Sequence, residues 1–187
     1  MDQVRSGPFI QLENITEAGL RSLGQLTDVT SLYVDTPTFT DPDLVHLKSL
    51  SQLHLLCLRS PSITDAGLMH LAKLTNIQHL SLRGTSVRGT GLKYFADLSQ
   101  LESLDLGDTP LTDEGLQFVQ QFLGLESLCI DGTRVTDAGL RNLKGWKQLK
   151  RLSVAGTQSN EAAIAELITA LPELHVRTRV MPVGDHE

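Results

Sequence analysis

Apolar positions recur along this chain with a fixed period, and the polar positions between them recur with the same period. The stretch ITEAGL at residues 15–20 returns as ITDAGL at 63–68 and as VTDAGL at 135–140. Looser copies begin at Phe39, Val87, Leu111 and Ser159, so that each copy starts 24 positions after the previous one. A fixed period of this length is typical of a solenoid, in which each copy of the repeat is one coil.

The first half of each period predicts a short strand. In residues 77–88, apolar residues alternate with polar ones through Leu80 and Leu82, which indicates a strand with one buried face. Gly84 and Thr85 follow and predict a turn. Strands are expected in every period, the first near residues 9–12 and the last near residues 175–178, which makes eight.

The second half of each period predicts a short helix. Thr64 suits an N-cap position, and Asp65 in the first turn complements the helix dipole. Leu68, Leu71 and Leu74 follow at a spacing of three and form one apolar stripe. Glycine or alanine recurs at the position of Gly67 in five of the six other copies, which indicates a close approach of the helix to its neighbour or to the sheet. The helix at residues 161–171 is expected to be the longest.

Composition and charge narrow the class of protein. The net charge is −6 with acids and bases interspersed, which argues against a nucleic-acid binder. No apolar run reaches the roughly 20 residues of a membrane span, and residues 1–11 do not resemble a signal peptide. We therefore expect a soluble, cytoplasmic protein with one domain over residues 1–187. It would comprise an N-terminal cap (1–14), repeats (15–158) and a C-terminal capping repeat (159–187).

The two cysteines, Cys57 and Cys129, lie three periods apart in the same column of the repeat. With strands about 4.8 Å apart, their α-carbons are separated by about 14 Å, whereas a disulfide needs about 7 Å or less. Both are therefore expected to be free thiols, which suits a reducing compartment.

The recurring L-x-x-L-x-L-x-x-T-x-V pattern resembles the leucine-rich repeat family over nearly the whole chain. The ITDAGL stretch is similar to the cysteine-containing subclass found in F-box proteins, and to shorter bacterial relatives. The resemblance implies an α/β fold: a curved, right-handed solenoid of about seven repeats, with a parallel sheet on the concave face and helices on the convex face.

Threonine stands where that subclass has cysteine or where other repeats have asparagine. A buried hydroxyl can bond to the turn backbone, so we expect a threonine ladder through Thr85, Thr109, Thr133 and Thr157. Pro37 and Pro61 interrupt this column in the first two turns, where the preceding residues, Thr36 and Ser60, are the expected substitutes.

Solenoids bind partners on their concave surface, and the period predicts which side chains point out of it, with Phe9, Tyr33 and Cys57 in one row. An apolar and aromatic patch flanked by arginines has the composition of a protein-binding site. The alternative is that Phe9 and Tyr33 only shield the first repeat. The candidate partner-binding residues are Phe9, Tyr33, Leu55, Cys57, Arg59, His79, Arg83, Asp105, Asp131 and Arg151.

Three other clusters receive less weight. Cys57, His79 and Asp105 supply a nucleophile, a base and an orienting acid, but His79 is two residues off the row of the other two, which argues against a catalytic triad, and the residues are not clustered as a metal site requires. Near the C-terminal end, Lys150, Arg151, Arg177 and Arg179 are interpreted mainly as a solvated end. One row recurs on successive helices and is interpreted as helix packing or a second surface: His46, His70, Tyr94 and Phe118.

The sequence therefore predicts a non-catalytic scaffold that binds a protein partner as a monomer, with no cofactor, metal, nucleic acid or membrane. One alternative is the recognition part of a degradation adaptor, whose F-box module would not fit into the segment 1–14 that precedes the first repeat. The other alternative is an enzyme that uses Cys57, His79 and Asp105.

Overall fold

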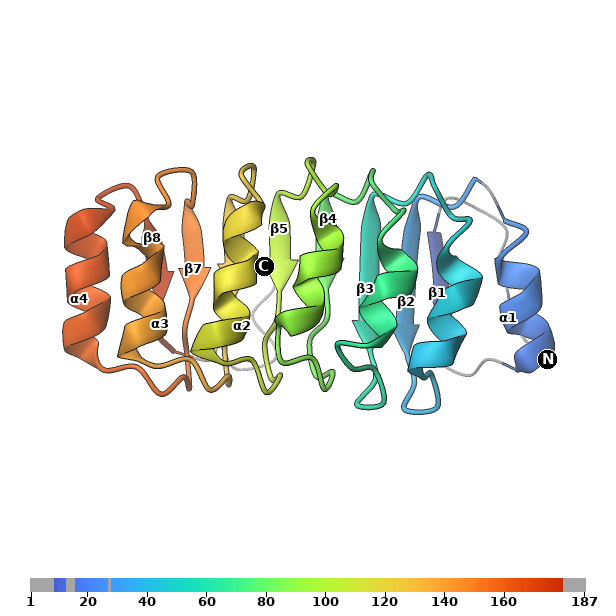
Figure 1. Ribbon diagram of the computed structural model, residues 1–187, viewed down its shortest axis with the longest axis horizontal. Helices are drawn as coiled ribbons and strands as arrows, with labels where there is room; N and C mark the ends of the chain where they lie inside the picture. Colours follow the sequence, from blue (N-terminus) through green and yellow to red (C-terminus); the bar gives the residue numbers. More distant parts are fainter. Residues whose placement is uncertain (1–8, 13–15, 27, 180–187) are drawn as a thin grey trace, which may run out of the picture.

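A computed structural model describes residues 9–12, 16–26 and 28–179 of the chain (Figure 1). Within these residues, eight parallel strands form one open sheet in the order of the chain. The expected eight-stranded α/β solenoid is confirmed. The strands are β1 (Phe9–Leu12), β2 (Ser31–Asp35), β3 (Leu55–Arg59), β4 (His79–Ser81), β5 (Ser103–Asp105), β6 (Ser127–Cys129), β7 (Arg151–Ser153) and β8 (His175–Arg177).

The helices lie side by side over one face of the sheet, as Figure 1 shows, and they leave the other face uncovered. We call this uncovered face the concave face. The helical segments are α1 (Glu17–Leu23), η1 (Asp41–Leu47), η2 (Gly67–Leu71), η3 (Thr90–Phe95), α2 (Asp113–Gln117), η4 (Phe118–Gln121), α3 (Asp137–Arg141), η5 (Asn142–Gly145) and α4 (Glu161–Ala170).

The segments labelled η are 3-10 helices rather than α-helices. In η1 and η2 the leucines recur at every third position, which matches the periodicity of a 3-10 helix. In η2 this spacing places Leu68 and Leu71 against the core, followed by Leu74 in the next turn. The last helix, α4, has 10 residues and is the longest of the described helices, as expected.

From β2 onward, paired residues on neighbouring strands are one full period apart, so that Leu32 pairs with Leu56 and Leu56 with Leu80. The first step is different. Phe9 pairs with Ser31 and not with Tyr33, so the prediction that Phe9 shares a row with Tyr33 was wrong. A shift of two positions keeps each side chain on its face of the strand. Ile10 and Leu12 therefore still enter the core.

The core is one continuous cluster between the sheet and the helices. Its largest contributions come from the columns that the period predicted, and most of these side chains are fully buried. The central strand column is Leu32, Leu56, Leu80, Leu104, Leu128 and Leu152. Since neighbouring coils bury one another's leucines, the stack stabilises repeats that could not fold alone.

Thr85, Thr109 and Thr133 of the threonine column are buried as expected, Thr157 is only partly buried, and each hydroxyl bonds within its own turn. The Oγ1 atom of Thr85 donates to the carbonyl of Leu82 at 2.6 Å, and Thr109, Thr133 and Thr157 make the equivalent bond. In the second turn, Ser60 is buried instead and donates to the carbonyl of Phe39 in the preceding coil at 2.6 Å. The preceding residue does substitute where proline interrupts the column.

A second column joins the coils at the start of the helices. The carboxylate of Asp41 accepts from the backbone N and the Oγ1 of Thr64, at 2.8 and 2.6 Å. Asp113 does the same for Thr136. Sequence reasoning gave the equivalent Asp65 only a helix-dipole role, but it accepts from three backbone amides of the following coil. These bonds hold each coil at a set distance from the one before it.

The glycine column is explained by this close approach. A β-carbon at Gly67 would overlap the carboxylate of Asp41, and one at Gly115 would overlap the backbone carbonyl of Arg88. The expectation of a close approach between neighbouring coils at Gly67 is therefore confirmed.

Candidate functional site

Two rows of side chains run across the concave face, perpendicular to the strands. The first row consists of the first side chain of each strand that points out of the concave face. The second row lies two positions further along each strand. The first row is Phe9, Ser31, Leu55, His79, Ser103, Ser127, Arg151 and His175; the second row is Gln11, Tyr33, Cys57, Ser81, Asp105, Cys129, Ser153 and Arg177. A third row follows at the strand ends: Asp35, Arg59, Arg83, Gly107, Asp131, Ala155 and Arg179.

An aromatic pair occupies the N-terminal end of these rows. The rings of Phe9 and Tyr33 pack in a tilted arrangement with 5.2 Å between their centroids. Phe9 is 51% exposed, and both Tyr33 and Leu55 are partly exposed. Cys57, which was expected in the same patch, is buried. The exposed part of the patch therefore consists of two aromatic rings and one leucine.

A shallow depression of about 230 Å³ continues from this patch over β3–β5. Tyr33, Leu55, His79 and Asp105 are among the residues that line it. His79 is exposed, and its imidazole makes no hydrogen bond or ion pair with the residues that the structure describes. Arg59 at the edge is exposed and pairs loosely with Asp35, with 3.8 Å between Nη1 and Oδ2.

Arg83 lies at the centre of an internal polar cluster. Its guanidinium pairs with Asp105 at 3.3 Å and with Asp108 at 2.9 Å, and its Nη1 lies 3.5 Å from the Sγ of Cys129. Gly107 leaves the space through which the guanidinium passes, because a β-carbon there would overlap Nη1. Arg83 and Asp105 are therefore bonded to each other before any partner arrives.

Asp131 was expected to project into solvent, but the structure buries it. Its carboxylate accepts from the Oγ of Ser153 at 2.6 Å and from the backbone N of Ala155 at 2.8 Å, and it pairs with Arg177 at 2.9 Å. These donors lower the pKa of Asp131 even though burial alone would raise it. The carboxylate of Asp131 is therefore bonded to the following coils, and Asp131 has almost no exposed surface.

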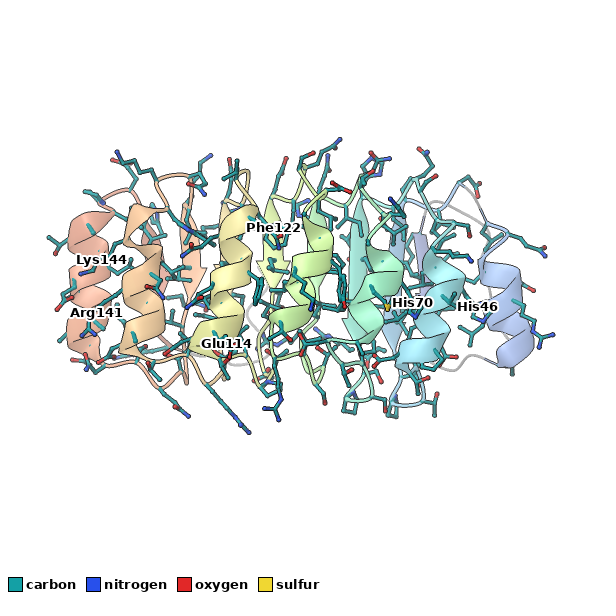
Figure 2. All side chains as sticks on the ribbon, viewed as in Figure 1. His46, His70, Glu114, Phe122, Arg141 and Lys144 are labelled. Carbon is teal, nitrogen blue, oxygen red and sulfur yellow. The ribbon has the colours of Figure 1, made fainter. Side chains whose placement is uncertain are left out.

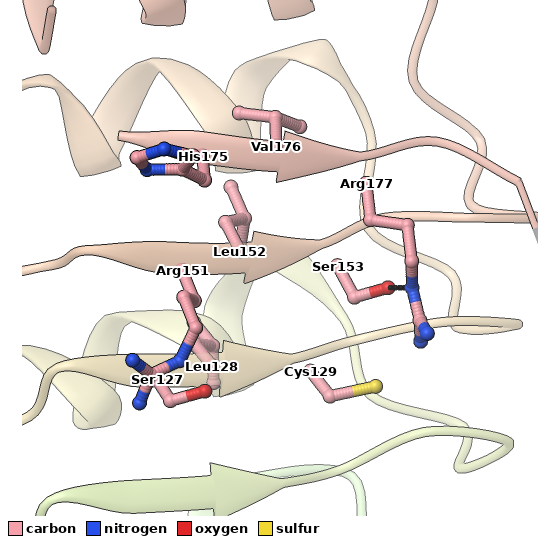
Figure 3. Close-up of a pocket in the computed structure, with 9 residues that line it drawn as sticks. All are labelled: Ser127, Leu128, Cys129, Arg151, Leu152, Ser153, His175, Val176 and Arg177. Carbon is pink, nitrogen blue, oxygen red and sulfur yellow. Dashed lines mark hydrogen bonds between the residues drawn. The ribbon is translucent and has the colours of Figure 1, made fainter. Parts of the chain in front are cut away.

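A second depression of about 420 Å³ lies at the C-terminal end of the concave face, over β6–β8 (Figure 3). Arg151 and His175 stand side by side at one end of it, and both are exposed. At the other end, the Nε of Arg177 donates to the Oγ of Ser153 at 2.9 Å. Sequence reasoning interpreted these cations mainly as a solvated end, and the depression between them could not be found from the repeat pattern.

The candidate catalytic set is not assembled. Cys57, Ser81 and Asp105 occupy the second row on β3–β5, whereas His79 belongs to the first row. His79 makes no hydrogen bond with Cys57 or Asp105 in the described residues. Burial raises the pKa of the Cys57 thiol, which disfavours the thiolate that a nucleophile needs. The geometry thus gives no support to acyl-transfer chemistry.

The four residues of the predicted row on the helices differ in how deeply they are buried. His46 and His70 lie on successive helical segments and are partly buried (Figure 2). Phe118 packs against the core, which fits the helix-packing interpretation. Tyr94 is 38% exposed, with the ammonium of Lys93 5.1 Å from its ring centroid.

The described residues contain no group of three or more histidine, cysteine or acidic side chains placed to hold a metal ion. None of the helices that the structure describes has the length and apolar character to cross a membrane. Both cysteines are free thiols, as expected.

Comparisons with known proteins agree with this architecture. Residues 99–119 match the family model described as Leucine Rich repeat. An internalin (inlF) from Listeria monocytogenes is similar, with 21% identity and a TM-score of 0.67 over 91% of this chain and 46% of that one. The internalin C2 of the same organism has 20% identity and a TM-score of 0.68, over 94% of this chain and 74% of that one.

A leucine-rich-repeat protein of Leptospira interrogans has 21% identity and a TM-score of 0.61, over 82% of this chain and 38% of that one. The chain thus spans less than half of the length of inlF and of the Leptospira protein. No curated protein matches the sequence significantly. At these identities the likeness concerns the fold, and the match to the family model is limited to residues 99–119. The F-box-type subclass stays a prediction.

Proposed function

We propose that this chain is a non-catalytic protein-binding module whose partner lies across the concave face. The observation that carries the proposal is the first row. Six of its polar side chains make no hydrogen bond or ion pair in the described part of the chain, whereas Arg83, Asp105, Asp131 and Arg177 of the second and third rows are held in ion pairs. These six residues are Ser31, His79, Ser103, Ser127, Arg151 and His175.

The aromatic end supports a protein partner rather than a small molecule. Phe9 and Leu55 belong to the first row, and Tyr33 packs against Phe9 from the second. Exposed aromatic side chains beside polar groups are enriched in protein interfaces. Both depressions on this face are shallow, whereas small-molecule sites enclose most of their ligand.

The absence of a catalytic function is part of the proposal. His79 is not within a hydrogen-bonded set with Cys57 and Asp105 in the described residues, and burial raises the pKa of Cys57. A catalytic thiol would react with iodoacetamide much faster than Cys129 at neutral pH, and we expect both thiols to react slowly.

Two finer statements remain proposals. We infer a monomer that binds no nucleic acid, in a reducing compartment such as the cytoplasm, which the two free thiols support. A degradation adaptor would be a special case of the same function. It would use the same face and would need a further domain outside this sequence.

The proposal is tested by replacing exposed side chains on one face of the molecule at a time. The concave triple variant is Phe9→Ala, Tyr33→Ala and His79→Ala. The matched control removes exposed apolar side chains outside the concave face: Met69→Ala, Tyr94→Ala and Leu123→Ala. Both variants should keep the circular dichroism spectrum of the wild type.

Proteins captured from the source cell by the wild type are identified, purified and measured again one by one. We expect the concave variant to weaken the binding of a genuine partner at least about tenfold, which corresponds to about 1.4 kcal/mol. The control should change the affinity less than about twofold. Loss of binding in the control alone would move the site to the helical face and overturn the proposal.

A further inference from the structure

We infer that the bound partner carries a cluster of acidic side chains, which Arg151 and His175 receive at the C-terminal end of the concave face. The inference rests on the proposed function and adds the chemistry and the direction of the partner segment to it. The argument comes from which charges on this face are already paired.

Each aspartate in the three rows has an arginine beside it. Asp35 pairs with Arg59, Asp105 with Arg83, and Asp131 with Arg177. The rows contain three aspartates against five arginines, although the whole chain has a net charge of −6. The acidic excess of the protein thus lies elsewhere, and this face is left with a positive surplus.

The surplus comprises two arginines: Arg179, which lines another depression beside α4, and Arg151, which lines the depression over β6–β8. The guanidinium of Arg151 has no ion pair or hydrogen bond within the part of the chain that the structure describes, and the first row contains no acid at all. Lys150, the residue before it, is instead neutralised by Glu126 at 2.6 Å. Figure 3 shows the Arg151 side chain extending from β7 over β6 beside Ser127. An unpaired guanidinium of this kind binds carboxylates in a bidentate manner.

Two further groups of the depression suit the same ligand. His175 is the register partner of Arg151 on β8, and Ser127 is its partner on β6. The imidazole and the hydroxyl can each donate a hydrogen bond to a carboxylate oxygen. Arg177 lies across the depression, but Asp131 and Ser153 hold its guanidinium. The depression of about 420 Å³ has room for more than one acidic side chain.

The two ends of the first row set a spacing on the partner. Leu55 is four strands from Arg151, and Phe9 is six strands from it. At about 4.8 Å per strand, these separations are about 19 and 29 Å. An extended segment covers them in about six to nine residues. The partner segment should therefore contain an apolar or aromatic residue about six to nine positions from its acidic cluster.

A display library of short random peptides provides the probe. The full chain is used to select peptides, and single binders are then measured by fluorescence anisotropy against the wild type, Arg151→Glu and Tyr33→Ala. Lys73→Glu is the matched control, since it makes the same charge change at an exposed residue just beyond η2. The Arg151 side chain is exposed and makes no hydrogen bond or ion pair with the residues that the structure describes, so its substitution should leave the fold intact.

We expect the selected peptides to be enriched in aspartate and glutamate at the stated spacing from an apolar residue. Arg151→Glu should weaken their binding at least about tenfold, because it replaces an attractive charge with a repulsive one. Lys73→Glu should have less than about a twofold effect, and about 0.5 M salt should weaken binding by wild type.

The two hypotheses fail differently. Peptides that lose affinity with Tyr33→Ala but are not acidic, or that tolerate Arg151→Glu, would overturn this inference and leave the proposed function standing. Peptides that tolerate both substitutions, or a library without any binder, would contradict both.

Discussion

The guanidinium of Arg83 reaches across two strands to the thiol of Cys129, with 3.5 Å between Nη1 and Sγ. The same guanidinium pairs with Asp105 and Asp108. One side chain of the fourth coil is therefore bonded to the two coils that follow it. Gly107 makes this possible because a side chain there would occupy the space of the guanidinium.

Replacing Arg83 should destabilise the fold more than replacing any loosely paired arginine of the same face. We expect Arg83→Ala to lower the free energy of unfolding by about 1–2 kcal/mol, because two carboxylates lose a partly buried partner. Arg83→Lys should recover little, since a compact ammonium lacks the planar fork of donors with which the guanidinium spans Asp105, Asp108 and the thiol. Urea unfolding followed by circular dichroism measures both. Arg59→Ala is the control, and its exposed pair should contribute less than about 0.5 kcal/mol. Equal effects at both positions would contradict the assignment.

The thiol of Cys129 should make the stability depend on pH in the alkaline range. Burial and the nearby Asp105 carboxylate raise the pKa of Cys129 from 9.0 to about 12. The folded state therefore keeps a proton that the unfolded state loses, so this contribution is complete below pH 9 and is lost as the pH rises toward 12.

Wild type and Cys129→Ser should thus diverge above pH 9. The free energy of unfolding of the wild type should fall more steeply, by at most about 1.4 kcal/mol per pH unit. The difference will be smaller than this because the thiol is partly exposed. Urea unfolding at several pH values between 8 and 10.5 measures the two slopes. Parallel slopes would show that the thiol titrates alike in the folded and unfolded chains.

The aspartate column should contribute to stability through the next coil rather than through its own helix. Asp113→Ala should lower the free energy of unfolding by about 1–2 kcal/mol, because the backbone N and the hydroxyl of Thr136 both lose their acceptor. Glu114 is the control: it lies beside Asp113 in the first turn of α2 and is exposed. Glu114→Ala should cost less than about 0.5 kcal/mol. If the two substitutions cost the same, the helix dipole explains the aspartate and the bonds between coils do not.

Glycine substitutions should separate close approach from helix propensity. Gly115→Ala adds a β-carbon that overlaps the backbone carbonyl of Arg88, so the coils must move apart. We expect a loss of about 2 kcal/mol, in the range of overpacked cores. At Gly145 the β-carbon would meet nothing within 4 Å, so Gly145→Ala should be neutral or slightly stabilising. Thermal unfolding of the two variants gives the comparison, and a stabilised Gly115→Ala would disprove the close packing.

The period alone was sufficient to predict the eight strands, the apolar columns and the buried threonines. Each copy of the repeat has the same local preferences, so an in-register stack is the arrangement that buries Leu32, Leu56 and Leu80 together. The same reasoning failed at the first strand. The period places Phe9 beside Tyr33, but the alternation of Ile10 and Leu12 is satisfied equally well two positions away, and the structure pairs Phe9 with Ser31.

The candidate site was less predictable than the fold. Pattern can state that Asp131 points away from the leucines of its own strand, but it cannot show that Arg177 and Ser153 from later coils cover the carboxylate. Likewise, the sequence places both Arg83 and Arg151 among the candidate binding residues of the concave face. Only the first has acidic partners within reach, and this difference decides which charge is left for a partner.

The sequence by itself determined the period, the direction of the strands and the identity of the core, because these depend on properties that each repeat carries locally. The tertiary structure decided the register of the first strand and the pairing of charges between coils. It also decided which side chains of the concave face remain free. These features depend on distances between residues of different coils, such as Phe9 and Ser31 or Asp131 and Arg177, and such distances exist only once the coils are stacked.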